Sequence, residues 1–436
     1  MSIKNIWIFS FLLIGIFFSC KKNKDENNGD ATNDPRIRTM VINGLSTDFV
    51  VDDEEGLIYN SDSLPYGTNI KALVPTFTGY GVVLTYQVNK NGVWTTYSNT
   101  TALDFTSGLT IRAIAPQTEY TKDYQIDIRV HNYDVEAFTW NNPVPLPVNG
   151  DVISEKAIFK NGFYYFFYTN SSANSYVLTS TDGENWINAG QIMILNPDWT
   201  TLTAMSQSSL AVKAGDALYV CDLSTPSSFV RSEAQLPQGF VLETPLFALG
   251  TNFWIIAEQG GLRYLCSLAQ DAMDYQQGRQ LPSVFPVDKI TTFVLSSGST
   301  MIGYIFGGSD LNGNGTVWAV DINGSVVRLT GGQSGFPALT YPMPFTFDNT
   351  LYIVGGMLAN GDYTRQCYAS SNSGATWTAN SHKTLPVEIG AMAAGSIFEY
   401  EPNRVILIGG KNQDGFLPMV RKGLLNQVIL DEINNH

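Results

Sequence analysis

From residue 147 onward, the sequence repeats itself at intervals of roughly 40 to 55 residues. A proline ends each segment, and four of these prolines follow Leu and one follows Phe: Pro147, Pro197, Pro237, Pro282, Pro337 and Pro386. The gaps between them, with the stretch to His436, give six units. A unit of this length cannot bury its own hydrophobic face, so the units must pack against one another.

Two further markers recur within these units. Strand-like runs end in Gly-Gly at 307–308, 355–356 and 409–410, with a weaker copy at 260–261. A Trp follows, as at Trp318 and Trp377, and we expect it in the outer strand, filling the wedge between neighbouring sheets. Paired glycines permit a backbone conformation or a close approach that a Cβ would block. The pattern resembles the Kelch repeat of propellers such as the central domain of galactose oxidase, in which each repeat is one four-stranded blade. With six units, the resemblance implies a six-bladed β-propeller.

The last unit provides a test of ring closure. It contains "GSIFEYE", "RVILIGG" and "MVRKGLLNQ", but no outer strand with a Trp. The segment "AFTWNNPVPLP", Ala137 to Pro147, has that Trp at Trp140 and ends in Leu-Pro. We therefore predict that residues 137–147 pair with the final blade and close the ring, which removes a free sheet edge. The propeller would then span residues 134–436.

Residues 36–133 show a different pattern, with short alternating runs separated by turn residues. "LTIRAIA" and "YQIDIRV" alternate strictly, and Asn91-Gly92 joins two such runs as a hairpin turn. Several strands within about a hundred residues, without a helical period, indicate a β-sandwich. The phrase "LPYGTNIKALVPTF" resembles Ig-like modules, and we expect a spacer role for this domain, with sugar binding as the alternative.

The first twenty residues are predicted to be a signal peptide. Lys4 precedes an apolar run of about thirteen residues, which is too short to span a bilayer. The run ends at Cys20 and resembles a bacterial lipoprotein cleavage site, with Phe17 where Leu is usual. The resemblance implies that Cys20 becomes the lipidated first residue; an uncleaved anchor and plain secretion are the alternatives. Residues 21–35 are polar and are expected to form a flexible tether.

The amino-acid composition and net charge limit the kinds of molecule that this chain is expected to bind. The chain has 436 residues, of which 44% are apolar and 15% are charged, as expected for a globular protein of two or more domains. The net charge is -14 and the basic residues are scattered, which argues against a nucleic-acid partner. The chain resembles Bacteroidetes-type surface lipoproteins with an Ig-like module before a Kelch-type propeller. That resemblance implies a lipid anchor in the bacterial outer membrane, with the protein exposed at the cell surface.

The stretch "SSNSGATW", residues 370–377, has the spacing of the Asp-box of sialidases. "STDGENW", residues 180–186, lies at the corresponding place in the first unit. Asn372 and Asp182 would accept hydrogen bonds from their own turns, and the glycines that follow would supply positive φ. A turn that recurs at the outer corner of different blades lies far from any site in the central channel. We interpret both stretches as turns of the scaffold.

The sequence offers few residues that could bind a metal ion. Asp310, Asn312, Asn314 and Asp321 fit the spacing of a calcium loop, which would bind weakly because it has one early acidic ligand; an ordinary hairpin is the alternative. Copper chemistry needs histidines, and the propeller holds two, near and at its end. No cofactor is expected beyond this weak calcium. The cysteines at 221, 266 and 367 lie in apolar runs and are expected to be buried.

The connections that enter each new blade are the best candidates for a ligand site at a mouth of the central channel. They carry the aromatic residues Trp199, Phe240, Phe285 and Tyr341, which could stack on sugar rings or pack between blades. The leading hypothesis is a non-catalytic binding protein on a lipid anchor, directed at a glycan or a protein.

A secreted glycoside-active enzyme, sialidase-like or another glycoside hydrolase, is the alternative, with acids at the propeller mouth. The sialidase pattern is incomplete, because the propeller arginines fall at no common position. Glu399 and Glu401 flank Tyr400 in a stretch that also fits an ordinary turn. A glycosidase of the paired-carboxylate type stays open, since its two acids need only converge in space. A structural role is the third hypothesis.

Overall fold

The structure is a computed structural model that describes residues 33–45, 47–80, 83–117, 120–270, 272–298, 300–309, 313–330 and 335–427. Cys20, the expected signal peptide and most of the expected tether lie outside this range. The chain forms two compact units, Met1–Asn132 and Tyr133–His436. Within the described part of the chain, no helix has the length and hydrophobicity needed to cross a membrane.

The N-terminal unit is a β domain in which two sheets enclose one core. The smaller sheet pairs β1 (Ile37–Ile42) with β4 (Pro75–Gly79). The larger sheet has, in spatial order, β2 (Phe49–Asp52), β3 (Leu57–Asn60), β8 (Thr121–Asp127), β7 (Leu109–Ile114), β5 (Thr85–Lys90) and β6 (Val93–Tyr97). Alternate residues of both sheets, such as Met40, Ile111 and Tyr124, fill the core. Asn91 and Gly92 connect β5 to β6 with φ of 54° and 86°, so the predicted hairpin is confirmed.

The second unit is built from a series of antiparallel sheets, numbered here 1 to 6 in chain order. Sheet 1 consists of β11 (Val152–Lys160), β12 (Phe163–Asn170), β13 (Ser175–Ser180) and β14 (Ile187–Ile192). Sheet 2 consists of β15 (Pro197–Ala204), β16 (Ser209–Ala214), β17 (Ala217–Asp222) and β18 (Val230–Arg231). Sheet 3 consists of β19 (Val241–Leu249), β20 (Asn252–Gln259), β21 (Leu262–Ala269) and β22 (Gln276–Gln280).

The remaining sheets follow the same order. Sheet 4 consists of β23 (Thr291–Ser297), β24 (Thr300–Ser309), β25 (Gly315–Asp321) and β26 (Val326–Arg328). Sheet 5 consists of β28 (Met343–Phe347), β29 (Thr350–Val354), β31 (Cys367–Ser370) and β32 (Thr378–Ala379). Sheet 6 has β33 (Ser396–Glu401), β34 (Arg404–Ile408) and β37 (Met419–Leu425), and shorter pairs join β27 (Leu339–Thr340) to β30 (Met357–Leu358) and β35 (Lys411–Asn412) to β36 (Gly415–Phe416).

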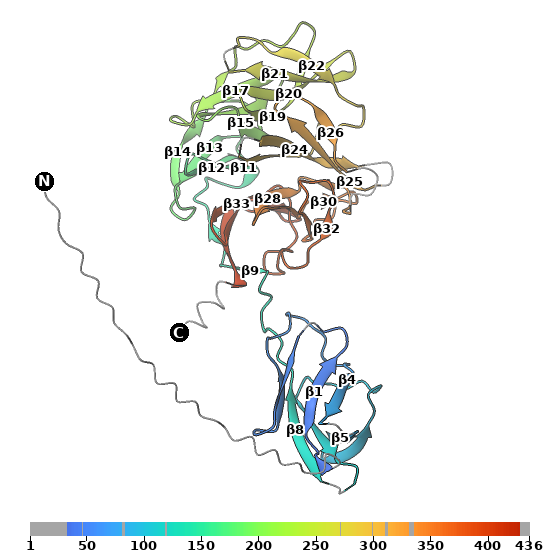
Figure 1. The fold of residues 1–436 in the computed structure, drawn as a ribbon. Helices are drawn as coiled ribbons and strands as arrows, with labels where there is room; N and C mark the ends of the chain where they lie inside the picture. Colours follow the sequence, from blue (N-terminus) through green and yellow to red (C-terminus); the bar gives the residue numbers. More distant parts are fainter. Residues whose placement is uncertain are drawn as a thin grey trace, which may run out of the picture. The chain divides into compact units, whose positions relative to one another are not determined.

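The first strands of these sheets form a ring. β11 contacts β15, and the contacts continue through β19, β23, β28 and β33 back to β11. Figure 1 shows the sheets following one another in chain order, from green through yellow to red. Hydrophobic clusters fill the wedges between adjacent sheets, such as the cluster of Tyr165, Phe167 and Leu210 between sheets 1 and 2. The all-β prediction with a β-propeller is therefore confirmed.

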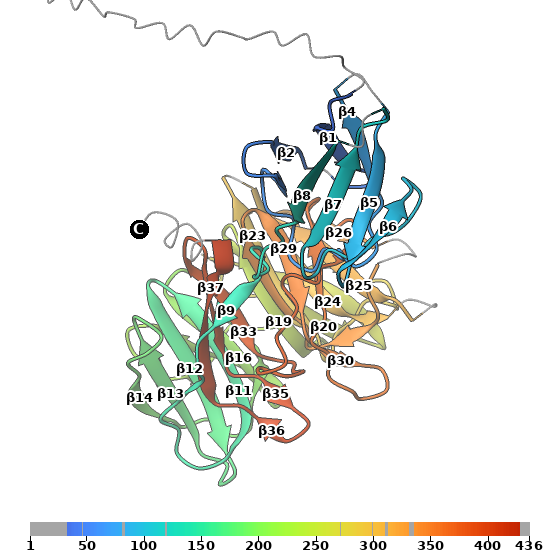
Figure 2. The ribbon, with the colours of Figure 1, turned by 90° about the horizontal axis from the view of Figure 1, so that it is seen from below.

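The ring is closed by residues upstream of sheet 1. β9 (Phe138–Trp140) and β10 (Val144–Pro145) both pair antiparallel with β37, and Trp140 lies opposite Gly423. Figure 2 shows β9 lying beside β37. The predicted closing strand from residues 137–147 is confirmed. Lys383 holds it in place, because its ammonium donates to the Glu136 carbonyl and lies 4.2 Å from the centre of the Phe138 ring.

The recurring glycines and tryptophans have distinct positions. Gly409 and Gly410 follow β34 with φ of 64° and 120°, and a Cβ on Gly409 would collide with the Glu155 carboxyl group. The expectation of a Trp in each outer strand is wrong for Trp318. That residue lies in β25, the third strand of sheet 4, where it is 4% exposed and packs against Phe285.

Candidate functional site

A pocket with a volume of about 750 Å³ lies in the channel of the second unit. Its walls come from the first strands of sheets 1, 2, 3, 4 and 6, from the hairpins that follow several of them, and from the end of β21 in sheet 3. Residues from five sheets meet here because the first strands all run in the same direction along the channel. The pocket is therefore the best-supported candidate for a ligand site among the described residues.

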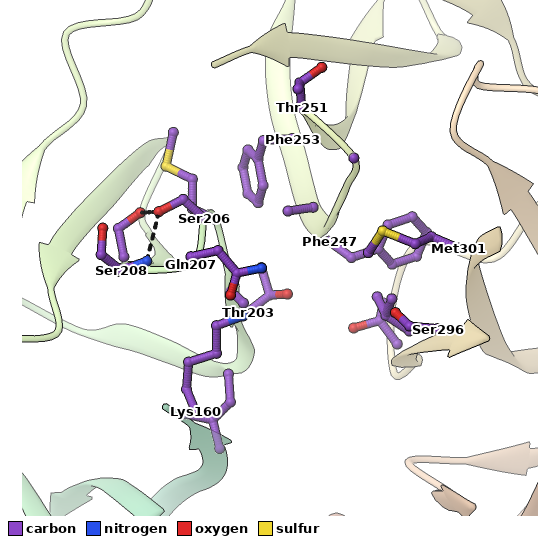
Figure 3. Close-up of a pocket in the computed structure, with 18 of the residues that line it drawn as sticks. Lys160, Thr203, Ser206, Gln207, Ser208, Phe247, Thr251, Phe253, Ser296 and Met301 are labelled. Carbon is purple, nitrogen blue, oxygen red and sulfur yellow. Dashed lines mark hydrogen bonds between the residues drawn. The ribbon is translucent and has the colours of Figure 1, made fainter. Parts of the chain in front are cut away.

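Uncharged hydrogen-bonding groups line one side of this pocket. The β15–β16 turn contributes Ser206, whose hydroxyl lies 2.6 Å from that of Ser209 and accepts the Ser208 N–H at 3.1 Å (Figure 3). The Gln207 side chain is exposed within this turn, and Gln270 contributes a second exposed amide from sheet 3. Amide and hydroxyl groups both donate and accept, which suits the hydroxyl groups of a polyol.

Aromatic side chains form another side of the pocket. Phe247 and Phe253 belong to sheet 3 and are 1% and 3% exposed, so they support the wall. Phe159 is 38% exposed and its ring centre lies 6.2 Å from that of Phe398. An exposed aromatic face beside hydrogen-bonding groups combines apolar contact with polar selection, as ligand pockets usually do.

Among the described residues that line the pocket, none is Asp, Glu or Arg, and Lys160 is the single charged side chain. Lys160 ends β11 and extends toward Thr203 and Gln207 (Figure 3). Burial lowers its pKa. Glu399 follows Phe398 but lies on the opposite face of β33, where burial and the charge of Asp348 raise its pKa.

Two of the four aromatic residues proposed from the sequence are buried between sheets. Trp199 is fully buried, stacks near Phe167 and donates its indole N–H to the Thr169 hydroxyl at 2.8 Å. Phe285 is 2% exposed and packs on Trp318. These rings fill wedges between sheets, so they offer no open face to a ligand.

The other two are half-buried at the amino-terminal ends of the first strands, away from the pocket. Phe240 packs edge-to-face on Tyr264 at 5.2 Å. Burial raises the pKa of Tyr341, and the carboxylates of Asp198 and Asp288 raise it further. The sequence therefore predicted a site at one mouth of the channel, whereas the pocket lies at the other mouth.

Of the four proposed calcium ligands, the two described ones, Asn314 and Asp321, do not converge. Asp310 and Asn312 lie outside the described residues. Asn314 precedes β25 and Asp321 ends it, so about 20 Å of extended strand separates them. The Asp321 carboxylate accepts the N–H groups of Asn323 and Ser325 at 2.9 and 2.8 Å, which occupies it in the β25–β26 turn. Within the described ranges, no three His, Cys, Asp or Glu side chains are grouped as a metal site.

The stretch with Asp-box spacing forms the hairpin between β31 and β32, the third and fourth strands of sheet 5. The Asn372 side chain accepts the Thr376 N–H at 2.9 Å, and Trp377 donates its indole N–H to the Gly374 carbonyl at 3.0 Å. In sheet 1, the hairpin between β13 and β14 has the same contacts: Asp182 accepts from Asn185 at 2.8 Å, and Trp186 donates to Gly183 at 3.1 Å. Neither hairpin lines the pocket.

Sequence reasoning missed Phe159, Lys160, Gln207 and Phe398. The available signal was positional for three of them, because Phe159 and Lys160 end the first strand of sheet 1 and Gln207 lies in the turn that follows the first strand of sheet 2. Phe398 lies within the first strand of sheet 6. Once the repeat is aligned, these turns form a set around one mouth of the channel. Their residue types share no motif, so composition alone does not mark them.

The fold and the pocket define a class of protein: a β domain followed by a β-propeller with a ligand-sized pocket in its channel. The chain belongs to the DUF6242 family. Residues 134–433 match the DUF6242 beta propeller domain, and residues 18–128 match the DUF6242 N-terminal domain, a domain of unknown function.

Comparison with solved structures shows a likeness to the chain described as "Structure of YjhT". The two are 14% identical with a TM-score of 0.46, over 64% of this chain and 95% of that chain. Comparison with curated proteins finds no match.

Proposed function

We propose that this protein is a non-catalytic glycan-binding protein, with the glycan bound in the channel pocket. The observation that carries the proposal is the lining of the pocket, which combines the exposed Phe159 and the half-buried Phe398 with hydroxyl and amide groups. A sugar ring has one apolar face and a rim of hydroxyl groups, and this lining complements both. The volume of about 750 Å³ suits a ligand of a few sugar units.

The lining favours binding over catalysis. Glycoside hydrolysis by the common mechanism needs two carboxyl groups that flank the bond to be cleaved. The described residues that line the pocket include no carboxyl group. They also include no arginine that could grip a substrate carboxylate in the manner of a sialidase.

The proposal places the protein on the bacterial outer membrane, anchored by lipid on Cys20 and exposed at the cell surface. Its support is the apolar run ending at Cys20 and the polar stretch of residues 21–35. The N-terminal β domain would hold a Kelch-type propeller of six blades away from the membrane. Incorporation of labelled palmitate into the protein, and its loss in Cys20→Ala, tests the anchor.

Binding is tested with a glycan array, followed by calorimetry on the best ligands. We expect Gln207→Ala and Phe398→Ala each to weaken binding about tenfold, because each removes one contact worth about 1.4 kcal/mol. Phe240→Ala, at the opposite mouth, is the matched control and should bind normally. If no glycan binds, or if Phe240→Ala is the only variant that loses binding, the proposal is wrong.

One observation favours a glycoside-active enzyme as the second candidate. Glu399, which follows Phe398 of the pocket lining, has a raised pKa, to which the charge of Asp348 on the neighbouring sheet contributes. A carboxyl group with a raised pKa beside a second acid is a typical general acid. Release of reducing sugar from array-positive glycans, abolished in Glu399→Gln, would establish this function in place of simple binding.

A further inference from the structure

The charge of the pocket differs from that of the protein around it. The whole chain has a net charge of -14, and such a protein repels anions from most of its surface. Among the described residues lining the pocket, Lys160 is the only charged one, so the pocket carries a local positive charge. A binding site for a neutral sugar has no need of this arrangement.

Lys160 has no partner among the described residues of the protein. None of the ion pairs or hydrogen bonds between described residues involves its ammonium group, whereas Lys213 donates to the Glu243 carbonyl at 2.6 Å and Lys422 pairs with Glu184 at 2.6 Å. Burial lowers the pKa of Lys160. A half-buried, unpaired cation is costly unless a ligand provides the counter-charge.

The surroundings of Lys160 also suit an anion. Figure 3 shows the side chain extending toward Thr203 and Gln207 on sheet 2. The Thr203 hydroxyl is already committed to the Leu246 carbonyl at 3.0 Å, but the exposed Gln207 amide is free to donate to a ligand. Glu399, the acid that follows Phe398, lies on the opposite face of β33 from Phe398, where the charge of Asp348 acts on it.

We propose that the pocket selects acidic saccharides, whose carboxylate or sulfate group pairs with the Lys160 ammonium while a sugar ring lies against Phe159 and Phe398. This inference rests on the proposed glycan-binding function and names the chemical class of its ligand. Phe159 and Lys160 are consecutive residues of β11, so their side chains point to opposite faces of the strand. The sugar ring of the ligand would lie on one side of the end of β11, and its acidic group on the other.

The experiment is calorimetry on the full chain with three tetrasaccharide probes. Tetragalacturonate carries carboxylates, its methyl ester is the matched neutral form, and a carrageenan-derived tetrasaccharide carries sulfates. We expect one of the acidic probes to bind at least tenfold more tightly than the methyl ester, with an affinity that falls as salt is raised. Which acidic probe binds distinguishes a carboxylate ligand from a sulfate ligand.

Variants test whether Lys160 is responsible for the tighter binding of the acidic probe. Lys160→Gln should bind the acidic probe at least tenfold more weakly, and Lys160→Arg should bind it within about threefold of the original protein. Lys289→Gln makes the same charge change at the opposite mouth, where the side chain is exposed, and should bind normally. Circular dichroism and thermal melting establish that all three variants are folded.

The outcomes separate this inference from the function on which it rests. Equal affinity for the methyl ester and the acid, or unchanged binding by Lys160→Gln, would overturn the selection of acidic saccharides but leave glycan binding intact. If none of the three probes binds and the glycan array is also empty, both proposals fail together.

Discussion

Glu155 shows how a single residue couples ring closure to pH. It lies on β11 at 3% exposure, and one carboxyl oxygen accepts the Gly410 N–H of sheet 6. The other oxygen has no hydrogen-bond partner among the described residues. Burial raises the pKa of this carboxyl group to about 8, from an ordinary 4.5. Glu155 is therefore protonated in the folded protein at neutral pH.

This pKa predicts how stability depends on pH. Between pH 4.5 and 8 the folded protein holds the Glu155 proton while the unfolded chain has lost it. Raising the pH through this window therefore lowers the free energy of unfolding, by at most about 1.4 kcal/mol per pH unit. The stabilisation is fully present below pH 4.5 and is lost as pH approaches 8. Urea unfolding from pH 5 to 8, monitored by Trp fluorescence, measures the slope.

Glu155→Gln is the matched variant, because it keeps the shape and removes the titration. Its free energy of unfolding should depend less on pH over this window than that of the original protein. Lys156, the next residue, titrates in the opposite sense: burial lowers its pKa to about 8, so it makes stability rise with pH above that value. Identical slopes for Glu155→Gln and the original protein would contradict the assignment.

Prediction from the sequence succeeded at residues whose role is local. Asn372 accepts hydrogen bonds within its own turn, and Asn91 adopts the positive φ expected of a hairpin. It left two roles open for Trp199, stacking on a sugar or packing between blades, because its sequence neighbours do not reveal the Thr169 hydroxyl that its indole N–H reaches across the wedge between two sheets. The sequence could not distinguish this buried ring from an exposed one, because burial is set by residues about thirty positions away.

At the scale of the element, the hairpin between the third and fourth strands of sheet 5 is held mainly by contacts within its own turn, beside one hydrogen bond from the Tyr304 hydroxyl of sheet 4 to the Ser373 carbonyl at 3.2 Å. In the β31–β32 hairpin, Ser370 donates to Asn372 at 3.0 Å and accepts the Gly374 N–H at 2.9 Å. Gly374 has φ of 84°, which an L residue rarely adopts. These contacts stay within one turn, so the turn stabilises the edge of sheet 5 without reaching the channel.

Asn372→Ala should therefore lower stability without changing ligand binding. It removes the acceptor of the Thr376 N–H and of the Ser370 hydroxyl, at a cost of about 1 kcal/mol. Asp182→Ala is the equivalent change in sheet 1 and should behave in the same way. Thermal melting and glycan calorimetry on both variants provide the measurement. Loss of binding at unchanged stability would mean that the hairpin takes part in the site after all.

The sheets were more predictable than the pocket for a physical reason. Each sheet buries its faces against its neighbours, so its strands carry a recurring apolar pattern, and the repeat prolines precede or begin the first strands. The pocket is lined by residues of five first strands and of turns that follow several of them, and these turns need only reverse the chain. Lys160 and Gln207 occupy such free positions. Folding does not restrict the residue types at these two positions, so no sequence pattern marks them as part of a site.

At the scale of the whole molecule, the two compact units raise the question of what each needs in order to fold. The N-terminal unit has its own core, which includes Ile111 and Ile126. The propeller has a closed ring of contacts, but its closing strands β9 and β10 come from upstream of sheet 1. The start of the propeller is therefore set by β-strand pairing with β37 rather than by the first repeat.

This arrangement predicts opposite results for two shortened chains. Residues 133–436 keep the closing strands and should melt within a few degrees of the propeller transition of the full chain. Residues 148–436 lose Phe138, Trp140 and Leu146, which pack against sheets 1, 5 and 6, and expose the edge of β37. We expect their melting temperature to fall by about 10 °C or more, because several kcal/mol of apolar burial is lost.

An exposed edge strand also pairs with other chains, so residues 148–436 should aggregate at concentrations where residues 133–436 stay monomeric. Adding a synthetic peptide of residues 133–147 to the shorter chain should restore part of the lost melting temperature, since the peptide can occupy the vacant place beside β37. A scrambled peptide of the same composition is the control, because it keeps charge and hydrophobicity but loses the register that sets Trp140 opposite Gly423. Equal melting temperatures for the two shortened chains would show that sheet 6 is stable without its partner, and that β9 and β10 are dispensable to the ring.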